Sequence, residues 1–273
     1  MSVGVAPLLR LILLCAASLA IVAPASAGAS ITPLPGEVTV VRDVRYGPWP
    51  AQRLDVYRPA ARPPGRLPLL VWVHGGGFRV GTKDAPRTAS MALAFARRGY
   101  AVAAIDYRLL ASATCAGPPL GSPRCVAAAR AAASDARLAL RVLRASAARW
   151  GIARGRVAIG GSSAGAIASL LVGTRPQPGA KVRAVVSVAG ALPASSGLTP
   201  GDPPTLFFNG SADRMVPFRW ARRTAAALDG CGVPVRRHVF AGAGHDLWAH
   251  REAIAREASA FLAEHLAPAR REV

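Results

Sequence analysis

The stretch GGSSAG, residues 160–165, decides how this chain is organised. The apolar residues 157–159 come directly before it, and the apolar residues 166–172 follow it without a break. This order predicts a buried strand, a sharp glycine turn and a buried helix, the setting in which a G-x-S-x-G serine becomes a nucleophile. Only the register with Ser163 at its centre fits the motif. Because such a motif also occurs by chance, the rest of the chain must supply a base, an acid and an oxyanion hole.

Five histidines could supply the base that takes the serine's proton. His245 lies in AGAGHD, residues 241–246, directly after the last predicted strand, where a loop returns over the carboxyl edge of the sheet. This position fits a general base best. The others are expected within that strand, on the final helix or at the end of an earlier strand: His238, His250, His265 and His74.

Asp213 is the best candidate for the acid that orients the base, because it lies just past the end of the strand predicted over 205–208. The chain order Ser163, Asp213, His245 is the order in which the partners of this serine motif follow it. A structural alternative is that Asp213 caps the helix expected after Pro217. Three other aspartates fit the role less well: Asp106, Asp202 and Asp246.

The tetrapeptide HGGG, residues 74–77, predicts the oxyanion hole. It follows a continuous apolar run, residues 67–73, as a glycine loop after a buried strand should. Bare glycine backbone lets the N–H groups of Gly76 and Gly77 approach a developing oxyanion, and the N–H of Ala164 supplies a further donor. We expect His74 to hold this loop by hydrogen bonding rather than to transfer protons.

Strands and helices alternate along the chain, which predicts a mainly parallel sheet with helices on both faces. The expected strands are 37–46, 52–57, 67–74, 100–105, 157–161, 182–188, 205–208 and 233–240, the first two forming an antiparallel pair at one edge. The expected helices are 85–98, 126–150, 163–172, 220–228 and 250–266. Between residues 188 and 205 there is only a Pro/Gly/Ser loop, so we expect little or no cap over the site.

Residues 1–27 are typical of a secretory signal peptide. Arg10 is their only charge, the apolar run at residues 11–23 is short for a bilayer span, and ASA at residues 25–27 suits cleavage. The alternatives are an uncleaved N-terminal anchor and, less well supported, a lipoprotein modified at Cys15. Residues 28–273 are predicted to form one domain, exported to the cell envelope or beyond.

Three cysteines remain after such processing. Cys115 and Cys125 flank a turn-rich loop, and in an exported protein we expect them to form a disulfide that contributes about 3 kcal/mol. Cys231 is then left without a disulfide partner, as a free thiol near a helix end. Neither C-x-x-C spacing nor a His/Cys cluster occurs, so no metal site is predicted.

The formal net charge is +20, and removal of the signal would leave +19. No basic run with interleaved aromatics, zinc-finger spacing or basic zipper occurs, so nucleic-acid binding is not predicted. The simpler explanation is a solvated, arginine-rich surface. The alternative is weak electrostatic attraction to anionic wall polymers, membrane surfaces or acidic substrates.

Together, HGGGF at 74–78, DYRL at 106–109, GSSAG at 161–165, DRMVP at 213–217 and GHD at 244–246 resemble the α/β-hydrolase carboxylesterases of the hormone-sensitive-lipase-like and acetylesterase-like group. The resemblance implies a serine carboxylesterase with the triad Ser163, Asp213 and His245, acting on a small-molecule ester without metal or organic cofactor. The chain departs from the related G-x-S-A-G-G pattern at Ala166. Too few residues precede Val38 for the N-terminal helical cap of that group, which favours the compact acetylesterase-like branch.

Three functions remain open from the sequence. The first is an exported esterase for small-acyl esters. The second is a peptidase or amidase on the same triad, although such peptidases usually add a second domain. The third is a catalytically silent, basic wall-binding protein on a hydrolase scaffold. The sequence does not identify the substrate or the oligomeric state.

Overall fold

The structure, a computed structural model, describes residues 31–34, 38–61, 65–113, 115 and 121–268. The predicted signal peptide, residues 1–27, lies outside the described residues. Nine strands form one sheet in the order β1-β2-β3-β5-β4-β6-β7-β8-β9. The strands are β1 (Ile31–Leu34), β2 (Val38–Arg45), β3 (Arg53–Pro59), β4 (Leu67–Val73), β5 (Ala101–Ile105), β6 (Ile152–Ser162), β7 (Val185–Val188), β8 (Thr205–Gly210) and β9 (Val235–Phe240).

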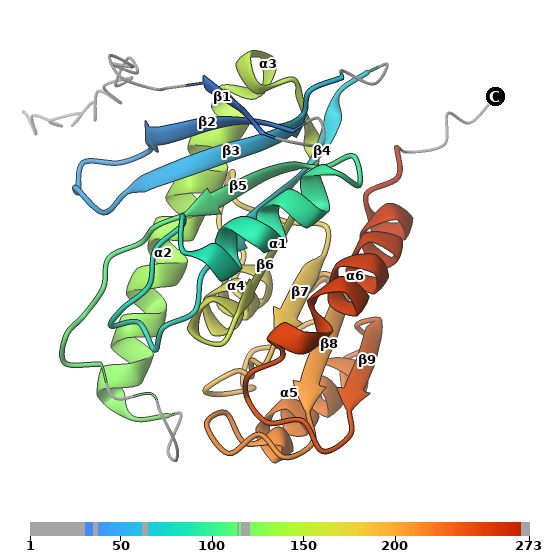
Figure 1. The fold of residues 1–273 in the computed structure, drawn as a ribbon. Coiled ribbons are helices and arrows are strands. Elements are labelled where there is room, and N and C mark those ends of the chain that lie inside the picture. The colour runs from blue at the N-terminus through green and yellow to red at the C-terminus, as the bar shows by residue number, and fades with distance from the viewer. Residues whose placement is uncertain (1–30, 35–37, 62–64, 114, 116–120, 269–273) are drawn as a thin grey trace, which may run out of the picture.

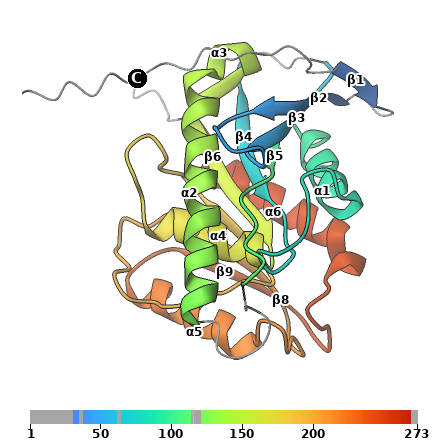
Figure 2. The ribbon, with the colours of Figure 1, turned by 90° about the vertical axis from the view of Figure 1, so that its left-hand side faces the viewer.

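Helices cover both faces of this sheet, as the alternation of elements predicted (Figure 1). They are α1 (Pro86–Ala96), α2 (Pro123–Ala145), α3 (Ala147–Trp150), α4 (Ala164–Thr174), α5 (Phe218–Gly230) and α6 (Arg251–His265), with a 3₁₀ turn η1 (Trp248–His250) before α6. α1 and α6 share one hydrophobic core with one face of the sheet, whereas α2 and α4 pack in the core on the other face. Figure 2 shows the sheet between these two layers.

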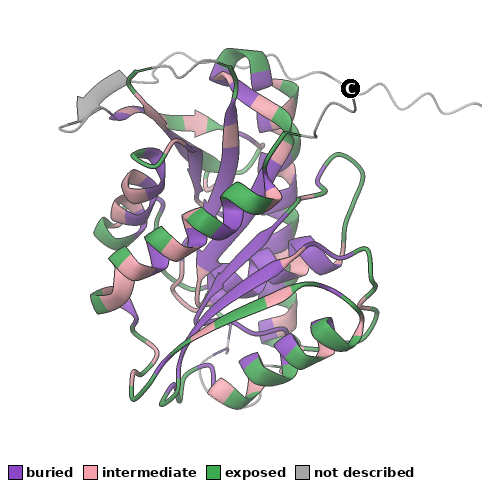
Figure 3. Ribbon diagram, turned by 90° about the vertical axis from the view of Figure 1, so that its right-hand side faces the viewer, coloured by how far each residue is buried: buried purple, intermediate pink, exposed green. Residues whose placement is uncertain are grey.

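Burial follows this layering. The central strands β4 and β5 consist almost entirely of buried residues, and the helices are buried along the side that faces the sheet (Figure 3). A strand covered on both faces needs apolar side chains on both, which explains the continuous apolar runs in the sequence. No helix in the described part of the chain is both long and apolar enough to cross a membrane.

The strands from β5 to β9 in the sheet order are parallel, and β1, β2 and β3 extend the sheet by antiparallel pairing. The sequence predicted the β2–β3 pair but not β1, which is a short ITPL segment without an alternating pattern. The helix predicted over 126–150 is two helices, because the chain turns at Ser146 (φ −96°, ψ 19°). The expected disulfide between Cys115 and Cys125 is present, and Cys231 is a half-buried free cysteine.

Candidate active site

The site lies at β4, where the chain places one following strand on one side of β4 and the next on its other side. β4 has β5 on one side and β6 on the other, both parallel to it, and Val73 at its end is in register with Gly161. In open α/β sheets, ligands bind at the carboxyl ends of the strands at such a point. The register brings the loop after β4 beside the turn after β6, so HGGG and GSSAG meet although they are far apart in sequence.

Ser163 occupies the tight turn between β6 and α4. Its backbone has φ 53° and ψ −118°, a strained conformation for a residue with a Cβ, and its N–H donates to the carbonyl of Val188. The two motif glycines permit close packing against β4. An added Cβ would lie 2.4 Å from the Val73 carbonyl oxygen at Gly161 and 2.0 Å from it at Gly165.

We therefore expect Gly165→Ala to lower the free energy of unfolding by about 3 kcal/mol or more, because the added methyl meets backbone that cannot rotate away. Gly155→Ala is the matched control, since the Cβ position at Gly155 in the same strand–helix unit has nothing within 4 Å. Urea unfolding followed by circular dichroism measures both. Equal stability of the two variants would contradict the required close approach of α4 to β4.

Ser163, His245 and Asp213 form one hydrogen-bonded chain. His245 Nε2 lies 2.9 Å from Ser163 Oγ, and His245 Nδ1 lies 2.7 Å from Asp213 Oδ2. The Asp213 side chain is fully buried, and that of His245 is 19% exposed. This is the geometry in which a carboxylate orients an imidazole to take a serine's proton.

Asp213 is held by its own turn and does not cap a helix. Its Oδ1 accepts the backbone N–H groups of Met215 and Val216 at 2.9 and 3.0 Å, which leaves Oδ2 for His245. The N-cap of α5 is Pro217, without a side-chain hydrogen bond, so the structural alternative for Asp213 is wrong. The N–H of Ala212 donates to the carbonyl of Ala243, which connects the loop of Asp213 to the loop of His245.

The HGGG loop turns in the left-handed region. Gly76, Gly77 and Phe78 have φ values of 115°, 63° and 62°, and a Cβ at Gly76 would lie 1.9 Å from the Val80 carbonyl oxygen. Within the described residues, the N–H groups of Gly76 and Gly77 have no hydrogen-bond acceptor. They are therefore available to an oxygen in the site. The loop approaches Ser163 at Gly75, where an added Cβ would lie 3.4 Å from Ser163 Cβ.

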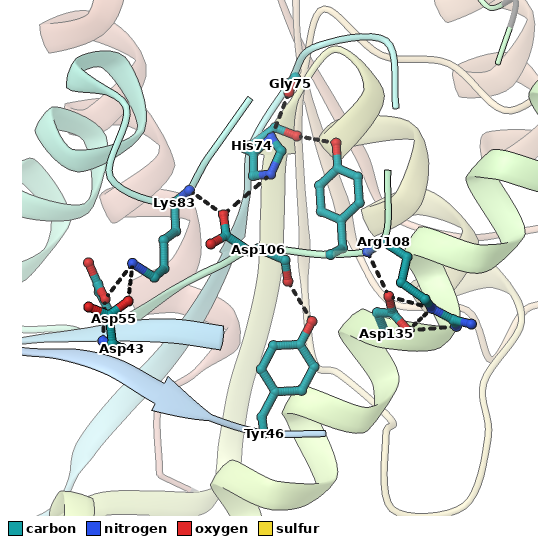
Figure 4. Close-up of polar contacts among 10 residues, drawn as sticks. Asp43, Tyr46, Asp55, His74, Gly75, Lys83, Asp106, Arg108 and Asp135 are labelled. Atoms are coloured by element: carbon teal, nitrogen blue, oxygen red, sulfur yellow. Dashed lines mark hydrogen bonds and ion pairs between the residues drawn. The ribbon is translucent and has the colours of Figure 1, made fainter. Parts of the chain in front are cut away.

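Behind this loop lies a polar network that the sequence motifs did not predict as a unit (Figure 4). His74 Nδ1 is 2.7 Å from the Gly75 carbonyl oxygen, and the His74 ring stacks on Tyr107 with centroids 4.3 Å apart. The Tyr107 hydroxyl donates to the His74 carbonyl at 3.0 Å. Burial lowers the pKa of His74, which favours its neutral form. These contacts agree with a role of His74 in holding the loop.

Asp106 braces the same loop from β5. Its Oδ1 accepts the backbone N–H of Lys83 at 2.6 Å and lies 3.7 Å from His74 Nε2, beyond hydrogen-bonding distance. Burial raises the pKa of Asp106 to about 6, although the Lys83 N–H opposes this shift. The Lys83 ammonium extends away from the site to Asp43 and Asp55, at 3.0 Å from each. The DYR segment therefore supports the loop that carries the predicted oxyanion donors.

The remaining histidines lie away from Ser163. His238 pairs with Glu257 at 2.7 Å, His250 stacks on Phe240 and His265 lies against Phe261. Among the residues that the structure describes, no group of three or more His, Cys, Asp or Glu side chains could hold a metal ion.

A cavity of about 790 Å³ opens above Ser163 and His245. Its apolar lining includes Trp72 on β4, Met91 on α1 and Ile254 on α6, three residues of one hydrophobic core that we call the floor of the cavity. The HGGG loop, Met215 and the segment after His245 form its walls. Cys115 also lines it, so the disulfide anchors part of the wall to the start of α2.

Comparison with known proteins agrees with this architecture. Residues 54–183 match the BD-FAE family, and residues 181–273 match Abhydrolase_4, described as TAP-like protein. No curated protein matches the sequence.

Several solved structures share the fold. A truncated carbohydrate esterase from gut microbiota superposes with a TM-score of 0.72 at 18% identity, over 88% of this chain and all of the other. Esterase 2 of Thermogutta terrifontis, phosphorylated by paraoxon, gives 0.68 at 22% identity, over 89% of this chain and 96% of the other. Its butyrate-bound form gives 0.67 at 22% identity, over 89% and 96%. The sheet order and these superpositions confirm the predicted fold: the chain has the α/β-hydrolase fold.

Proposed function

We propose that this protein is an exported serine carboxylesterase for esters with small acyl groups. The observation that carries the proposal is the continuous hydrogen-bonded chain from Ser163 through His245 to the buried Asp213. Such a chain activates a serine hydroxyl that is otherwise a weak nucleophile. The match to BD-FAE and the likeness to solved esterases support the same reaction class.

In the first half of the proposed reaction, Ser163 Oγ attacks the ester carbonyl while His245 Nε2 accepts the hydroxyl proton. This proton transfer makes His245 an imidazolium, which Asp213 Oδ2 stabilises by accepting a hydrogen bond from Nδ1–H. The N–H groups of Gly76, Gly77 and Ala164 donate to the negatively charged carbonyl oxygen. The tetrahedral intermediate then collapses, and His245 gives its proton to the departing alcohol.

In the second half, water attacks the acyl-serine. His245 Nε2 takes a proton from this water, and the oxyanion is held by the same backbone donors. Collapse of the second intermediate returns the proton to Ser163 Oγ and releases the carboxylic acid. The cycle needs no group beyond these side chains, the backbone donors and water.

The preference for small acyl groups rests on the floor of the cavity. Trp72 is almost fully buried there, and its ring packs against Phe95 with centroids 5.5 Å apart. A large buried ring packed against a second ring blocks the path of a long chain into the core. Structures of the Thermogutta esterase with propionate and butyrate bound are consistent with this size class. Export rests on the predicted signal peptide, residues 1–27, together with the disulfide.

The test compares hydrolysis of 4-nitrophenyl acetate, butyrate and decanoate, followed by treatment with paraoxon and peptide mass mapping. We expect kcat/KM to be highest for the two short esters and at least about tenfold lower for decanoate. Paraoxon should abolish activity and add its diethylphosphoryl group to the peptide containing Ser163. A decanoate preference would contradict the acyl-size proposal, and faster turnover of an aminoacyl-arylamide would favour a peptidase instead.

A further inference from the structure

Three arginines line the cavity: Arg79 beside the HGGG loop, Arg87 on α1 and Arg251 on α6. Asp246 is the only carboxylate among the described lining residues, and it pairs with Arg87 at 2.8 Å. Neither Arg79 nor Arg251 has a carboxylate partner within hydrogen-bonding distance in the described part of the chain. The cavity that contains Ser163 is therefore positively charged, and an anionic group would find unpaired guanidinium donors in it.

Two of these arginines share one aromatic ring. The Arg251 guanidinium carbon lies 4.9 Å from the centroid of Trp248, and that of Arg87 lies 5.7 Å from it. Contact with the ring restrains both side chains, so less rotamer entropy is lost when a ligand binds. Arg251 is also half-buried, and within the described residues its guanidinium group makes one other polar contact, a 3.4 Å hydrogen bond to the Trp248 carbonyl.

The position of both arginines is unfavourable for a structural cation. Arg87 lies in the first turn of α1 and Arg251 is the first residue of α6, where the helix dipole favours negative charge. The pair between Arg87 and Asp246 is exposed and contributes little to stability. An anion held between the two guanidinium groups would be favoured by both the arginines and the dipoles.

Helical spacing places these cations at one end of the apolar floor. Met91 follows Arg87 by four residues on α1, and Ile254 follows Arg251 by three on α6. Residues at these spacings share a helix face and are about one turn apart. A ligand with an apolar body on the floor would thus present its far end to Arg87 and Arg251.

We infer that the site takes esters whose alcohol half carries a carboxylate. The inference rests on the proposed esterase function. His245 must protonate the departing alcohol, so that half lies on the side of Ser163 where the chain continues from His245 through Trp248 to Arg251. The carboxylate accepts hydrogen bonds from Arg251, with Arg87 beside it, while the acyl carbonyl lies at Ser163.

The test uses one matched substrate pair, 4-acetoxybenzoate and 4-acetoxybenzamide. They share the acyl group and the aromatic body and differ in the charge of the distal group. We expect kcat/KM to be about tenfold or more higher for the acid at low ionic strength, the effect of one charge-assisted hydrogen bond. The ratio should fall in 0.5 M NaCl, because salt screens the partly exposed arginines.

Arg251→Gln should lower this acid-to-amide ratio about tenfold. Each preparation is assayed with both esters, so the ratio is independent of how much protein is correctly folded. Arg256→Gln is the matched control: it lies on the same helix, is exposed, does not line the cavity and should keep the wild-type ratio.

Equal rates for the two esters in the wild type would overturn this inference and leave the esterase function intact. An equal fall of the acid-to-amide ratio in Arg251→Gln and Arg256→Gln would also overturn it. The preference for the acid would then come from the overall positive charge and not from a contact with Arg251. Hydrolysis of neither ester would contradict the proposed function and this inference together.

Discussion

Ser163→Ala is expected to reduce kcat for 4-nitrophenyl butyrate by about 10⁵-fold or more, the scale of nucleophile loss in serine hydrolases with a complete triad. The variant should fold normally. Alanine keeps the Cβ that the turn already accommodates at φ 53°, and the lost hydroxyl has His245 as its hydrogen-bond partner. A steady-state assay and a thermal melt on the same preparation measure the two effects separately.

Ser146→Ala is the matched control for this substitution. Ser146 lies between α2 and α3 and does not line the cavity, so its replacement should leave kcat within a factor of about two. Activity of Ser163→Ala close to that of the control would show that another group is the nucleophile.

Asp213→Asn is expected to lower kcat by about 10⁴-fold, through the tautomer of His245. Two backbone N–H groups, of Met215 and Val216, already donate to Oδ1. The asparagine must therefore place its oxygen there and turn its NH₂ toward His245 Nδ1. The imidazole then carries its proton on Nε2, which faces Ser163 Oγ at 2.9 Å and cannot accept the serine's proton.

Asp202→Asn provides the control for changing a buried aspartate to its amide. Asp202 accepts hydrogen bonds from the backbone N–H and the hydroxyl of Thr199, in the loop before β8. We expect this variant to keep kcat within about threefold of the wild type. An Asp213→Asn variant that retained more than a tenth of the wild-type kcat would contradict the orienting role of Asp213.

The sequence alone was sufficient to predict a mainly parallel sheet between helices. It was also sufficient to predict which residues lie together at Ser163. Ser163, Asp213 and His245 each lie within five residues after the end of a predicted strand, and in a parallel sheet those strand ends share one edge. The apolar run before HGGG and the glycines around Ser163 are local signals, because tight turns and buried strands restrict which residues fit. The cysteine pairing could be predicted because Cys115 and Cys125 are only ten positions apart and flank a turn-rich loop.

The tertiary structure decided the distances and contacts between residues that are far apart in the sequence. The distance between Ser163 and His245 depends on packing across the whole sheet, and the support of the HGGG loop by Asp106 depends on the pairing of β4 with β5. The cationic end of the cavity depends on α1 and α6 lying against one face of the sheet, which brings Arg87 and Arg251 to the same tryptophan. Such contacts join residues far apart in the chain, and hydrophobic periodicity specifies which face of a helix is buried but not which neighbour lies beside it.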